Sequence, residues 1–260
     1  MQFWPLEMGG VISRLLPFPT APRRLSGIIR LMEFKSIREL EELPLFPLAT
    51  VLFPGAILPL HIFEDRYKAM MRHALENDRL FGLSYRKDAE AGAETPPDIG
   101  SIGCAARIET VMPLEEDKMD LICTGVIRYR VVGLNQLSPF LLARVEPFMD
   151  DPEPDNDLTE LFDDLRDIGK QFLMAAEVLN ELGVPINPNL PEDPEAFSLL
   201  LSSALPFDND RKQRLLEMTS TKLRLTRLKS YVTSALAVYT ERLKIQQQAK
   251  GNGHGRPVGQ

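Results

Sequence analysis

Residues 43–67 read LPLFPLATVLFPGAILPLHIFEDRY, an apolar run that contains four prolines and ends in the charged residues 64–66. Proline fixes φ, has no backbone N–H, and disfavours helical backbone at the residue before it. The run therefore cannot form one long helix despite its hydrophobicity. It predicts short strands joined by tight turns, with Pro54 and Gly55 as the clearest turn pair.

The segments that follow this run have patterns typical of one helix and several strands. Apolar residues recur every three or four positions over 64–77, which predicts a helix that starts at the charged cluster. Strand composition returns at 80–86, and apolar residues over 102–108, 121–132 and 141–145 indicate further strands. The first half of the chain is thus mostly β and suits a small twisted barrel.

The second half of the chain changes to a helical period. A capping-box pattern at Asp157 and Glu160 and a stop signal at Gly183 and Pro185 bound the first predicted helix. Eight apolar residues in it follow a 3-4 spacing and are expected to share one stripe: Leu158, Leu161, Leu165, Ile168, Phe172, Ala175, Leu179 and Leu182.

Further helices are predicted at 195–205, 210–218 and 221–247. We expect the last of them to pack with the first helix in an antiparallel bundle. Each of the two helices has an apolar stripe, and two such stripes are explained better by mutual packing than by a cofactor site. The acidic stretch 150–167 and the basic stretch 211–244 would then neutralise each other, the alternative being a basic docking face. The second stripe consists of Leu225, Leu228, Val232, Ala235, Tyr239 and Leu243.

These patterns divide the chain into four parts. Residues 1–40 show neither a helical nor a strand period and are expected to be an unstructured extension. They contain no signal-peptide pattern, and Met32 is an alternative start of translation. Residues 41–150 form the predicted β-rich lobe and residues 155–247 the predicted helical bundle. The polar, glycine-containing tail at 248–260 is expected to be disordered.

Composition restricts the class of protein. The chain has 44% hydrophobic and 26% charged residues, and no apolar run reaches the roughly 18 residues of a membrane helix, which indicates a soluble globular protein. A net charge of −7 argues against a nucleic-acid partner. Cys104 and Cys123 are too few for a disulfide framework, and they predict a reduced, cytoplasmic protein.

Motifs that carry chemistry are missing from the sequence. Asp164 stands where a phosphate-binding loop ending in Gly169-Lys170 would need its first glycine, so ATP hydrolysis is not expected. Neither His61 nor His73 has a nucleophile motif nearby, and no Ser-Lys or Ser-His-Asp arrangement is recognisable. Metal-ligand spacings are missing too. We therefore predict no enzymatic activity, no cofactor and no metal.

A series of short motifs resembles the N-terminal substrate-binding domain of Lon proteases, in order and in spacing. The similarity continues into the helices at 210–217 and 223–225 and covers roughly residues 41–230. The chain departs from the family at 116–119, where a glycine is usual, and at Asp65, where a proline is frequent. The motifs are Leu43-Pro44-Leu45, Leu52-Phe53-Pro54-Gly55, Leu58-Pro59-Leu60-His61, Ile62-Phe63-Glu64, Arg66-Tyr67, Asp98-Ile99-Gly100 and Gly125-Val126-Ile127-Arg128-Tyr129.

This resemblance implies an α+β fold, with a PUA-like β pseudo-barrel lobe followed by an α-helical bundle. It also implies a stand-alone form that lacks the ATPase and peptidase modules of Lon. The implied function is non-catalytic binding of unfolded or client polypeptides, as an adaptor in protein quality control whose other partner is a protease or chaperone. Two further classes stay open: an RNA-binding PUA-like protein, which the net acidity opposes, and a hydrolase with an unrecognised site.

Two sets of residues are singled out by these motifs. One set is expected to hold the fold, with Glu64 paired to one of the two arginines in the set: Pro54, Gly55, Pro59, Glu64, Arg66, Gly100, Gly125 and Arg128. The other set supplies candidate client contacts, because exposed apolar side chains mark interfaces, with the core as the alternative position for each: Phe46, Leu60, Phe63, Tyr67 and Met112. The sequence leaves the oligomeric state open.

Overall fold

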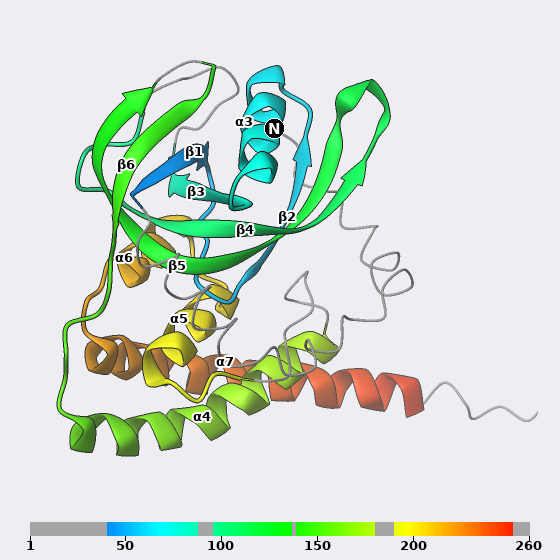
Figure 1. The fold of residues 1–260 in the computed structure, drawn as a ribbon. Helices are drawn as coiled ribbons and strands as arrows, with labels where there is room; N and C mark the ends of the chain where they lie inside the picture. Colours follow the sequence, from blue (N-terminus) through cyan, green and yellow to red (C-terminus); the bar gives the residue numbers. More distant parts are fainter. Residues whose placement is uncertain (1–40, 88–95, 137–138, 180–189, 252–260) are drawn as a thin grey trace, which may run out of the picture. The chain divides into compact units, whose positions relative to one another are not determined.

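The fold was obtained as a computed structural model (Figure 1), which describes residues 41–87, 96–136, 139–179 and 190–251. The chain forms two compact units. The first unit takes the chain up to Asp151 and also Pro206–Thr219, and the second takes Pro152–Leu205 and the chain from Ser220 onward. The extension predicted at 1–40 lies outside the described residues.

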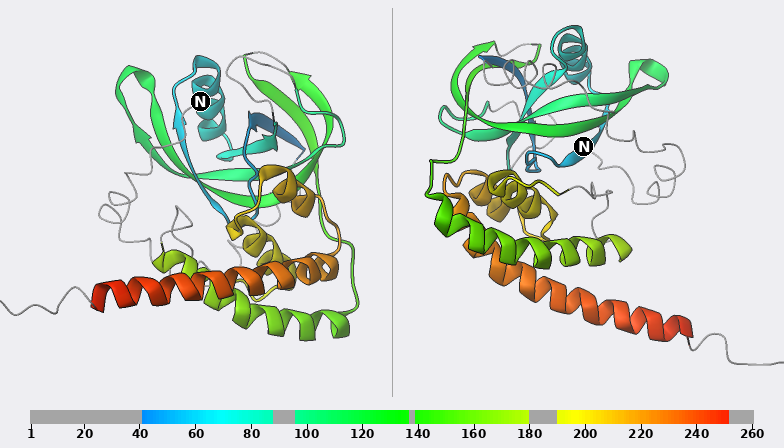
Figure 2. Two further views of the ribbon diagram at one scale, coloured as in Figure 1. Left: turned by 180° about the vertical axis from the view of Figure 1, so that it is seen from behind. Right: turned by 60° about the horizontal axis from the view of Figure 1, so that its bottom comes forward.

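The first unit is built on a six-stranded sheet in the order β2-β5-β4-β3-β1-β6. β1 and β3 are parallel, and the other neighbouring strands are antiparallel. β5 also pairs with β6, so five strands close into a ring while β2 pairs with β5 beside it (Figures 1 and 2). The strands are β1 Glu42–Leu48, β2 Ile57–Ile62, β3 Leu80–Tyr85, β4 Ile102–Pro113, β5 Met119–Gln136 and β6 Leu141–Pro147. The predicted pseudo-barrel and α+β class are confirmed.

The prolines of β1 occupy positions that a paired strand tolerates. β1 pairs with β6 over its first four residues and with β3 over its last four. Pro44 lies opposite Leu142 of β6 and Pro47 lies opposite Ser84 of β3, so each proline faces a partner strand on one side in this register. Because proline cannot donate to a ladder, such half-paired positions are where a strand can accommodate it.

Two hydrophobic clusters lie on opposite faces of this sheet. Leu43 and Leu45 of β1 belong to one cluster, which draws on all five strands of the ring. Phe46 and Leu48 belong to the other, which also contains the buried face of helix α3, Asp65–Glu76. Both faces of β1 are therefore buried, which explains why its sequence is a continuous apolar run with no alternation.

The Pro54-Gly55 pair forms the predicted turn. Ala56 N–H donates to the Phe53 carbonyl at 3.1 Å, and Gly55 has a φ of 80°, as the third residue of a type II turn requires. Gly55 N–H also donates to the Gly125 carbonyl at 2.8 Å, and Gly125 N–H donates to the Ala56 carbonyl at 2.9 Å. The turn is thus fastened to the middle of β5.

Helix α6, Asn209–Leu216, belongs to the first unit, together with the short 3-10 helix η2, Glu115–Asp117. The prediction assigned residues 155–247 to one helical bundle, and this assignment is wrong for 206–219. The amphipathic period of α6 identified a helix but carried no information on which apolar surface the helix covers. Its polar contacts with the β-rich unit, described below, supply that information.

The second unit consists of α4 Asp155–Val178, α5 Pro194–Ala204 and α7 Thr221–Gly251. α4 and α7 pack against each other, and the C-terminal part of α7 extends beyond the end of α4 (Figures 1 and 2). Asp164 pairs with Lys229 at 3.0 Å, and further along both helices Phe172 stacks on Tyr239 at 5.4 Å between ring centroids. The two helices therefore run parallel, and the prediction of an antiparallel pair is wrong, because α5 and α6 return the chain between them.

No described residue of the two predicted stripes is exposed, but only part of each stripe is fully buried. On α7, Leu225, Leu228, Val232 and Tyr239 are buried. On α4 the buried face is wider than predicted, because α5 also packs there: a Cβ on Gly169 would lie 3.0 Å from the Phe197 ring. The buried apolar residues of α4 are Phe162, Leu165, Phe172, Leu173, Ala175 and Ala176.

The ends of these helices differ from the predicted ones. α4 begins at Asp155 after Pro154, so Asp157 lies within the helix and is not its N-cap. The stop predicted at Gly183 and Pro185, and Leu182 of the stripe, lie outside the described residues. α7 continues to Gly251, four residues into the predicted tail at 248–260. The rest of that tail is also outside the described residues.

The contact between the Pro54-Gly55 turn and β5 predicts a severe effect of a single methyl group. A Cβ on Gly125 would lie 2.1 Å from the Phe53 carbonyl oxygen, so Gly125→Ala must displace the turn. We expect a loss of about 3 kcal/mol or more in the free energy of unfolding, measured by urea denaturation. Gly133→Ala on the same strand is the control, since its nearest neighbour is a flexible arginine side chain at 3.4 Å, and its effect should stay below about 1 kcal/mol. Equal losses would contradict the explanation.

Candidate functional site

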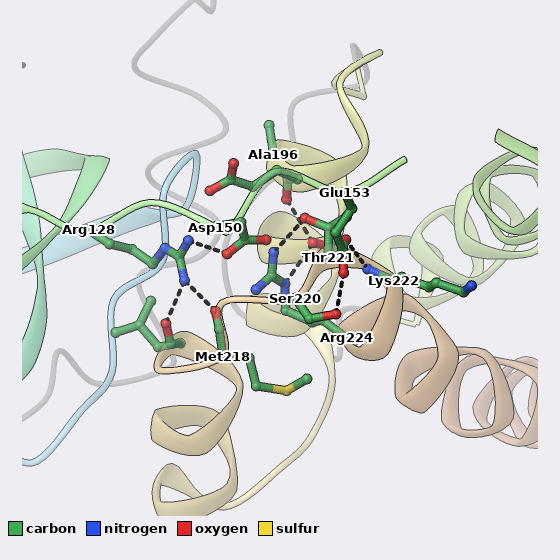
Figure 3. A network of polar contacts seen from close by, with 12 residues as sticks. Arg128, Asp150, Glu153, Ala196, Met218, Ser220, Thr221, Lys222 and Arg224 are labelled. Atoms are coloured by element: carbon green, nitrogen blue, oxygen red, sulfur yellow. Dashed lines mark hydrogen bonds and ion pairs between the residues drawn. The ribbon is translucent and has the colours of Figure 1, made fainter. Parts of the chain in front are cut away.

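Arg128 is the most buried charged side chain of the β-rich unit, with 1% of its side chain exposed. Its guanidinium donates to the carbonyl oxygens of Leu216 and Met218 at 2.9 and 2.7 Å, and it binds Asp150 Oδ1 at 2.5 Å (Figure 3). The two carbonyls lie at the C-terminal end of α6, where a cation is favourable because of the helix dipole. Arg128 therefore fastens a returning segment of the chain to β5.

Further polar contacts hold α6 in the same place. Asn209 donates to the Ala49 carbonyl at 2.7 Å, and Gln213 donates to the Ile102 carbonyl at 2.9 Å. The Tyr85 hydroxyl donates to Asp210 at 2.7 Å. Hydrogen bonds from a lysine ammonium and from the Tyr85 hydroxyl hold the pKa of Asp210 below its usual range. These contacts explain why this helix joins the β-rich unit.

The other motif residues around Arg128 shape the interior of the barrel. Tyr129 is fully buried, and its hydroxyl forms a hydrogen bond of 2.8 Å with the hydroxyl of Ser84. Its ring occupies the space that side chains would need at Gly82 and Gly103. Burial raises the pKa of the Tyr129 hydroxyl, so the group stays neutral in the barrel. Gly100 has a φ of 92° in the turn before β4, which explains the need for glycine there.

A second polar cluster in Figure 3 belongs to the helical unit and is structural as well. The Glu153 carboxylate accepts from the Ser220 hydroxyl at 2.5 Å and from Lys222 N–H at 2.9 Å, so it caps the N-terminus of α7. Arg224 is fully buried and donates to Ser198 of α5 at 2.7 Å. These contacts join the starts of α4 and α7 and bind α5 to them.

Glu64 pairs with Arg66, one of the two partners proposed for it. The Arg66 guanidinium donates to Glu64 Oε2 from both Nε and Nη2, at 3.1 and 2.9 Å, and lies over the Tyr67 ring. The pair joins residues two apart in sequence, so it organises the start of α3. It does not tie the helix to the barrel, because the other candidate partner, Arg128, is engaged elsewhere.

The candidate client-contact residues fall into two groups. Phe46 and Tyr67 are buried against each other with ring centroids 4.2 Å apart, so they belong to the core. Leu60 is half-buried and packs against the same cluster. Phe63 and Met112 are each 38% exposed. Two of the five candidates are thus available to a partner in this structure.

Phe63 and Met112 lie on one surface, at the end of β2 and near the hairpin of β4 and β5. His61, Asp120 and Met112 are directly opposite one another on three adjacent strands, so they share a face. The Phe63 ring stacks on the His61 ring at 5.7 Å between centroids. We call this surface the outer β2–β5–β4 face, and it consists of Pro59, His61, Phe63, Thr110, Met112, Asp120 and Ile122.

His61 and Asp120 form the polar centre of this face. His61 Nδ1 lies 2.6 Å from Asp120 Oδ1, and because an ionised carboxylate can only accept, Nδ1 carries the proton. A His-Asp pair is two-thirds of a serine-hydrolase triad. Among the described residues, however, no hydroxyl or thiol forms a hydrogen bond with His61. The pair therefore provides orientation and charge on this surface, and no described hydroxyl or thiol is hydrogen-bonded to it as a triad nucleophile would be.

The hairpin next to this face has an unusual turn. Glu116 and Asp117 have φ values of 58° and 60°, a conformation that favours glycine or asparagine. These are the positions where the resemblance leads one to expect glycine. Arg72 of α3 forms an ion pair with Asp117, and Lys118 pairs with Glu116 at 2.5 Å. Ion pairs of the Glu116 and Asp117 side chains thus stabilise a turn conformation that glycine would adopt without them.

Other reactive groups are placed for packing. Cys104 and Cys123 are free and buried, and burial raises the pKa of each thiol to about 12, which keeps them protonated and unreactive. Across the described part of the chain, no cluster of three histidine, cysteine or acidic residues could hold a metal ion. Within the same residues, no helix combines the length and apolar content that a membrane crossing requires.

Three residues of these sites were not singled out from the sequence. Asp150 is one carboxylate in a strongly acidic stretch, so nothing in the pattern marked it as the partner of Arg128. Asp120 and Glu153 are likewise ordinary acidic residues until the register of the strands and the start of α7 are known. These carboxylates bind partners that lie 22 to 69 positions away in the sequence, and no local sequence pattern identifies such partners.

Comparison with known proteins agrees with this geometry. A family model described as the ATP-dependent protease La (LON) substrate-binding domain matches residues 42–234. The chain is 26% identical over 211 residues to Lon protease 2 of Myxococcus xanthus and 28% identical over 221 residues to Lon protease of Trichlorobacter lovleyi. These alignments cover 80% and 82% of this chain but 25% and 26% of those proteins, so it spans about a quarter of their length.

Two solved structures share the fold. The N-terminal domain of Mycobacterium avium complex Lon protease aligns with a TM-score of 0.54 at 18% identity, over 74% of this chain and 98% of that one. A Lon N-terminal domain protein from Xanthomonas campestris aligns with a TM-score of 0.51 at 24% identity, over 73% and 98% of the two chains. The sequence matches lie within the substrate-binding region and do not include the ATPase or protease modules.

The burial of Arg128 predicts a large stability effect that its neighbour Arg130 does not share. Both guanidiniums lie over the Phe148 ring and pair with a carboxylate, but the side chain of Arg130 is 44% exposed. Arg128→Met should lower the free energy of unfolding by about 3–5 kcal/mol, because the buried carboxylate of Asp150 loses its ion pair with Arg128. Arg130→Met should lower it by less than about 1 kcal/mol. Urea denaturation of both variants measures the difference.

A second substitution separates the ion pair from general packing. If the loss in Arg128→Met comes from the broken ion pair with the buried Asp150 carboxylate, adding Asp150→Leu should recover part of it. A double variant whose loss equals the sum of the two single losses would show that the two residues act independently.

Proposed function

The chain belongs to the family of the ATP-dependent protease La (LON) substrate-binding domain, and from this membership we propose that it is a non-catalytic module that binds unfolded polypeptides. The observation that carries the proposal is the outer β2–β5–β4 face, where Phe63 at the end of β2 and Met112 on β4 remain exposed on either side of β5. Apolar side chains gathered at a surface are typical of a site for exposed hydrophobic segments.

The mode of action follows from what the matched region contains. The family match and the relatives cover the substrate-binding region of Lon proteases, and we propose that clients bound by this region are passed on to a protease or chaperone. In this role the chain is an adaptor in protein quality control. Its two reduced, buried cysteines favour the cytoplasm as its place of action.

The two alternatives have weaker support. RNA binding depends on a basic surface, whereas the chain has a net charge of −7 and the outer β2–β5–β4 face carries a carboxylate at its centre. A hydrolase needs a nucleophile, and among the described residues none forms a hydrogen bond with His61. No specific observation favours either class.

We expect loss of the exposed apolar side chains to weaken client binding. The double variant Phe63→Ser, Met112→Ser should reduce affinity for labelled, reduced and carboxymethylated albumin about tenfold or more, since each side chain contributes on the order of 1 kcal/mol of apolar burial. Fluorescence anisotropy measures the affinity, with native albumin as the non-client. Gel analysis of the same mixtures reports any cleavage.

A matched double variant controls for general loss of surface hydrophobicity. Ile99 and Met149 are 71% and 45% exposed on the same unit but are not part of the outer β2–β5–β4 face. Ile99→Ser, Met149→Ser should therefore leave affinity unchanged. If both double variants weaken binding equally, the outer β2–β5–β4 face is not the binding site. If the unaltered protein does not prefer unfolded over native albumin, the proposed function is wrong.

A further inference from the structure

Asp120 lies at the centre of the outer β2–β5–β4 face, and only one of its two carboxylate oxygens forms a hydrogen bond with a described residue. The residue is 8% exposed, and its Oδ1 binds His61 at 2.6 Å. Among the described residues, Oδ2 has no hydrogen-bond donor and Asp120 forms no ion pair except the one with His61. The residue as a whole is buried, but Oδ2 is not among the fully enclosed unpaired polar atoms, so a donor from a partner can reach it.

The surroundings of Asp120 add to the negative charge. Glu109 and Glu115 of the β4–β5 hairpin are exposed and form no ion pair with any described residue. Four described cations lie near the hairpin: Lys68, Arg72 and Lys118 pair with Asp65, Asp117 and Glu116, and Arg79 binds the backbone carbonyls of Ile108 and Glu109. The free negative charge of this region is therefore available to a partner.

Apolar side chains flank this carboxylate on both sides. Met112 lies directly across from Asp120 on β4, and Phe63 lies beyond His61 at the end of β2. Strands are about 4.8 Å apart, so β2 and β4 are separated by roughly 10 Å across β5. In an extended chain, side chains on one face recur about every 7 Å, so a chain with a charged group over Asp120 would have its i−2 and i+2 side chains within reach of Met112 on one side and of Phe63 beyond His61 on the other.

We propose that the outer β2–β5–β4 face selects extended apolar segments that carry a lysine or arginine, with the cation bound by Asp120 and the neighbouring apolar residues bound by Phe63 and Met112. This inference rests on the proposed function and names the class of segment that the same site accepts. A charge-assisted hydrogen bond to a partly desolvated carboxylate is stronger than a neutral one, and like charge at such a site is rejected. Acidic segments are excluded from the face.

Three peptides test the selection directly. Each is ten residues long, acetylated and amidated, with leucine at positions 3 and 7 and serine elsewhere, and with lysine, norleucine or glutamate at position 5. The lysine peptide should bind the full chain about tenfold more tightly than the norleucine peptide, and the glutamate peptide should bind more weakly than both. Raising the salt concentration from 50 to 500 mM should reduce the lysine preference in the unaltered protein.

A single substitution locates the preference. Asp120→Asn should bring the lysine-to-norleucine affinity ratio close to one. Asp98→Asn removes the same charge from an exposed turn on the same unit and should keep the ratio of the unaltered protein. Circular dichroism confirms that both variants fold, and the salt series tests the proposal independently of either variant.

The possible outcomes separate this inference from the proposed function. A lysine preference that survives Asp120→Asn, or a ratio of one in the unaltered protein, would overturn the selection while leaving polypeptide binding in place. Sedimentation that shows a dimer dissociated by Phe63→Ser would assign the face to a second copy of the chain and overturn it as well. If neither the peptides nor carboxymethylated albumin binds, the proposed function itself fails.

Discussion

The buried guanidinium of Arg128 determines which parts of the chain make up the first unit. It lies in β5, the strand that pairs with β2, β4 and β6, and its donors bind the C-terminal carbonyls of a helix some ninety positions later. The guanidinium is planar and directs its five donors in a fixed fork, so it holds two carbonyls and a carboxylate in one defined arrangement, which the compact ammonium of a lysine with its three rotating donors does not impose. The β-rich unit therefore includes α6, although α6 lies in the helical half of the sequence.

The Pro54-Gly55 turn and Gly125 impose a second constraint on the same strand. The turn approaches the β5 backbone so closely that glycine is required on both sides of the contact, for a positive φ in the turn and for space in the strand. Two motifs seventy residues apart thus encode one contact. This contact positions β2 beside β5, and the register that follows places His61, Asp120 and Met112 in one row.

Sequence reasoning identified most elements of this fold and few of its contacts. Prolines, glycines and apolar periods are local signals, so the turn, β1 to β6 and the bounds of α3 and α5 could be predicted to within a few residues of most ends. Phe46 and Phe63 look equivalent in the sequence, yet one is core and the other exposed, because exposure depends on which strands and helices cover a position. The parallel pairing of α4 and α7 and the partners Asp150 and Asp120 are long-range facts that no local pattern contains.

Because residues 206–219 belong to the first unit, the order in which the two units can fold during synthesis changes. During synthesis, the β strands up to residue 147 leave the ribosome well before α6 does. Until α6 follows, Arg128 and Asp150 lack the two carbonyls that complete their site. The first unit can therefore complete its folding only after most of the second unit has been translated. Domains normally fold in N- to C-terminal order during synthesis, and this chain departs from that order. A chain truncated at the apparent boundary near residue 150 would lack α6, an integral part of the β-rich unit.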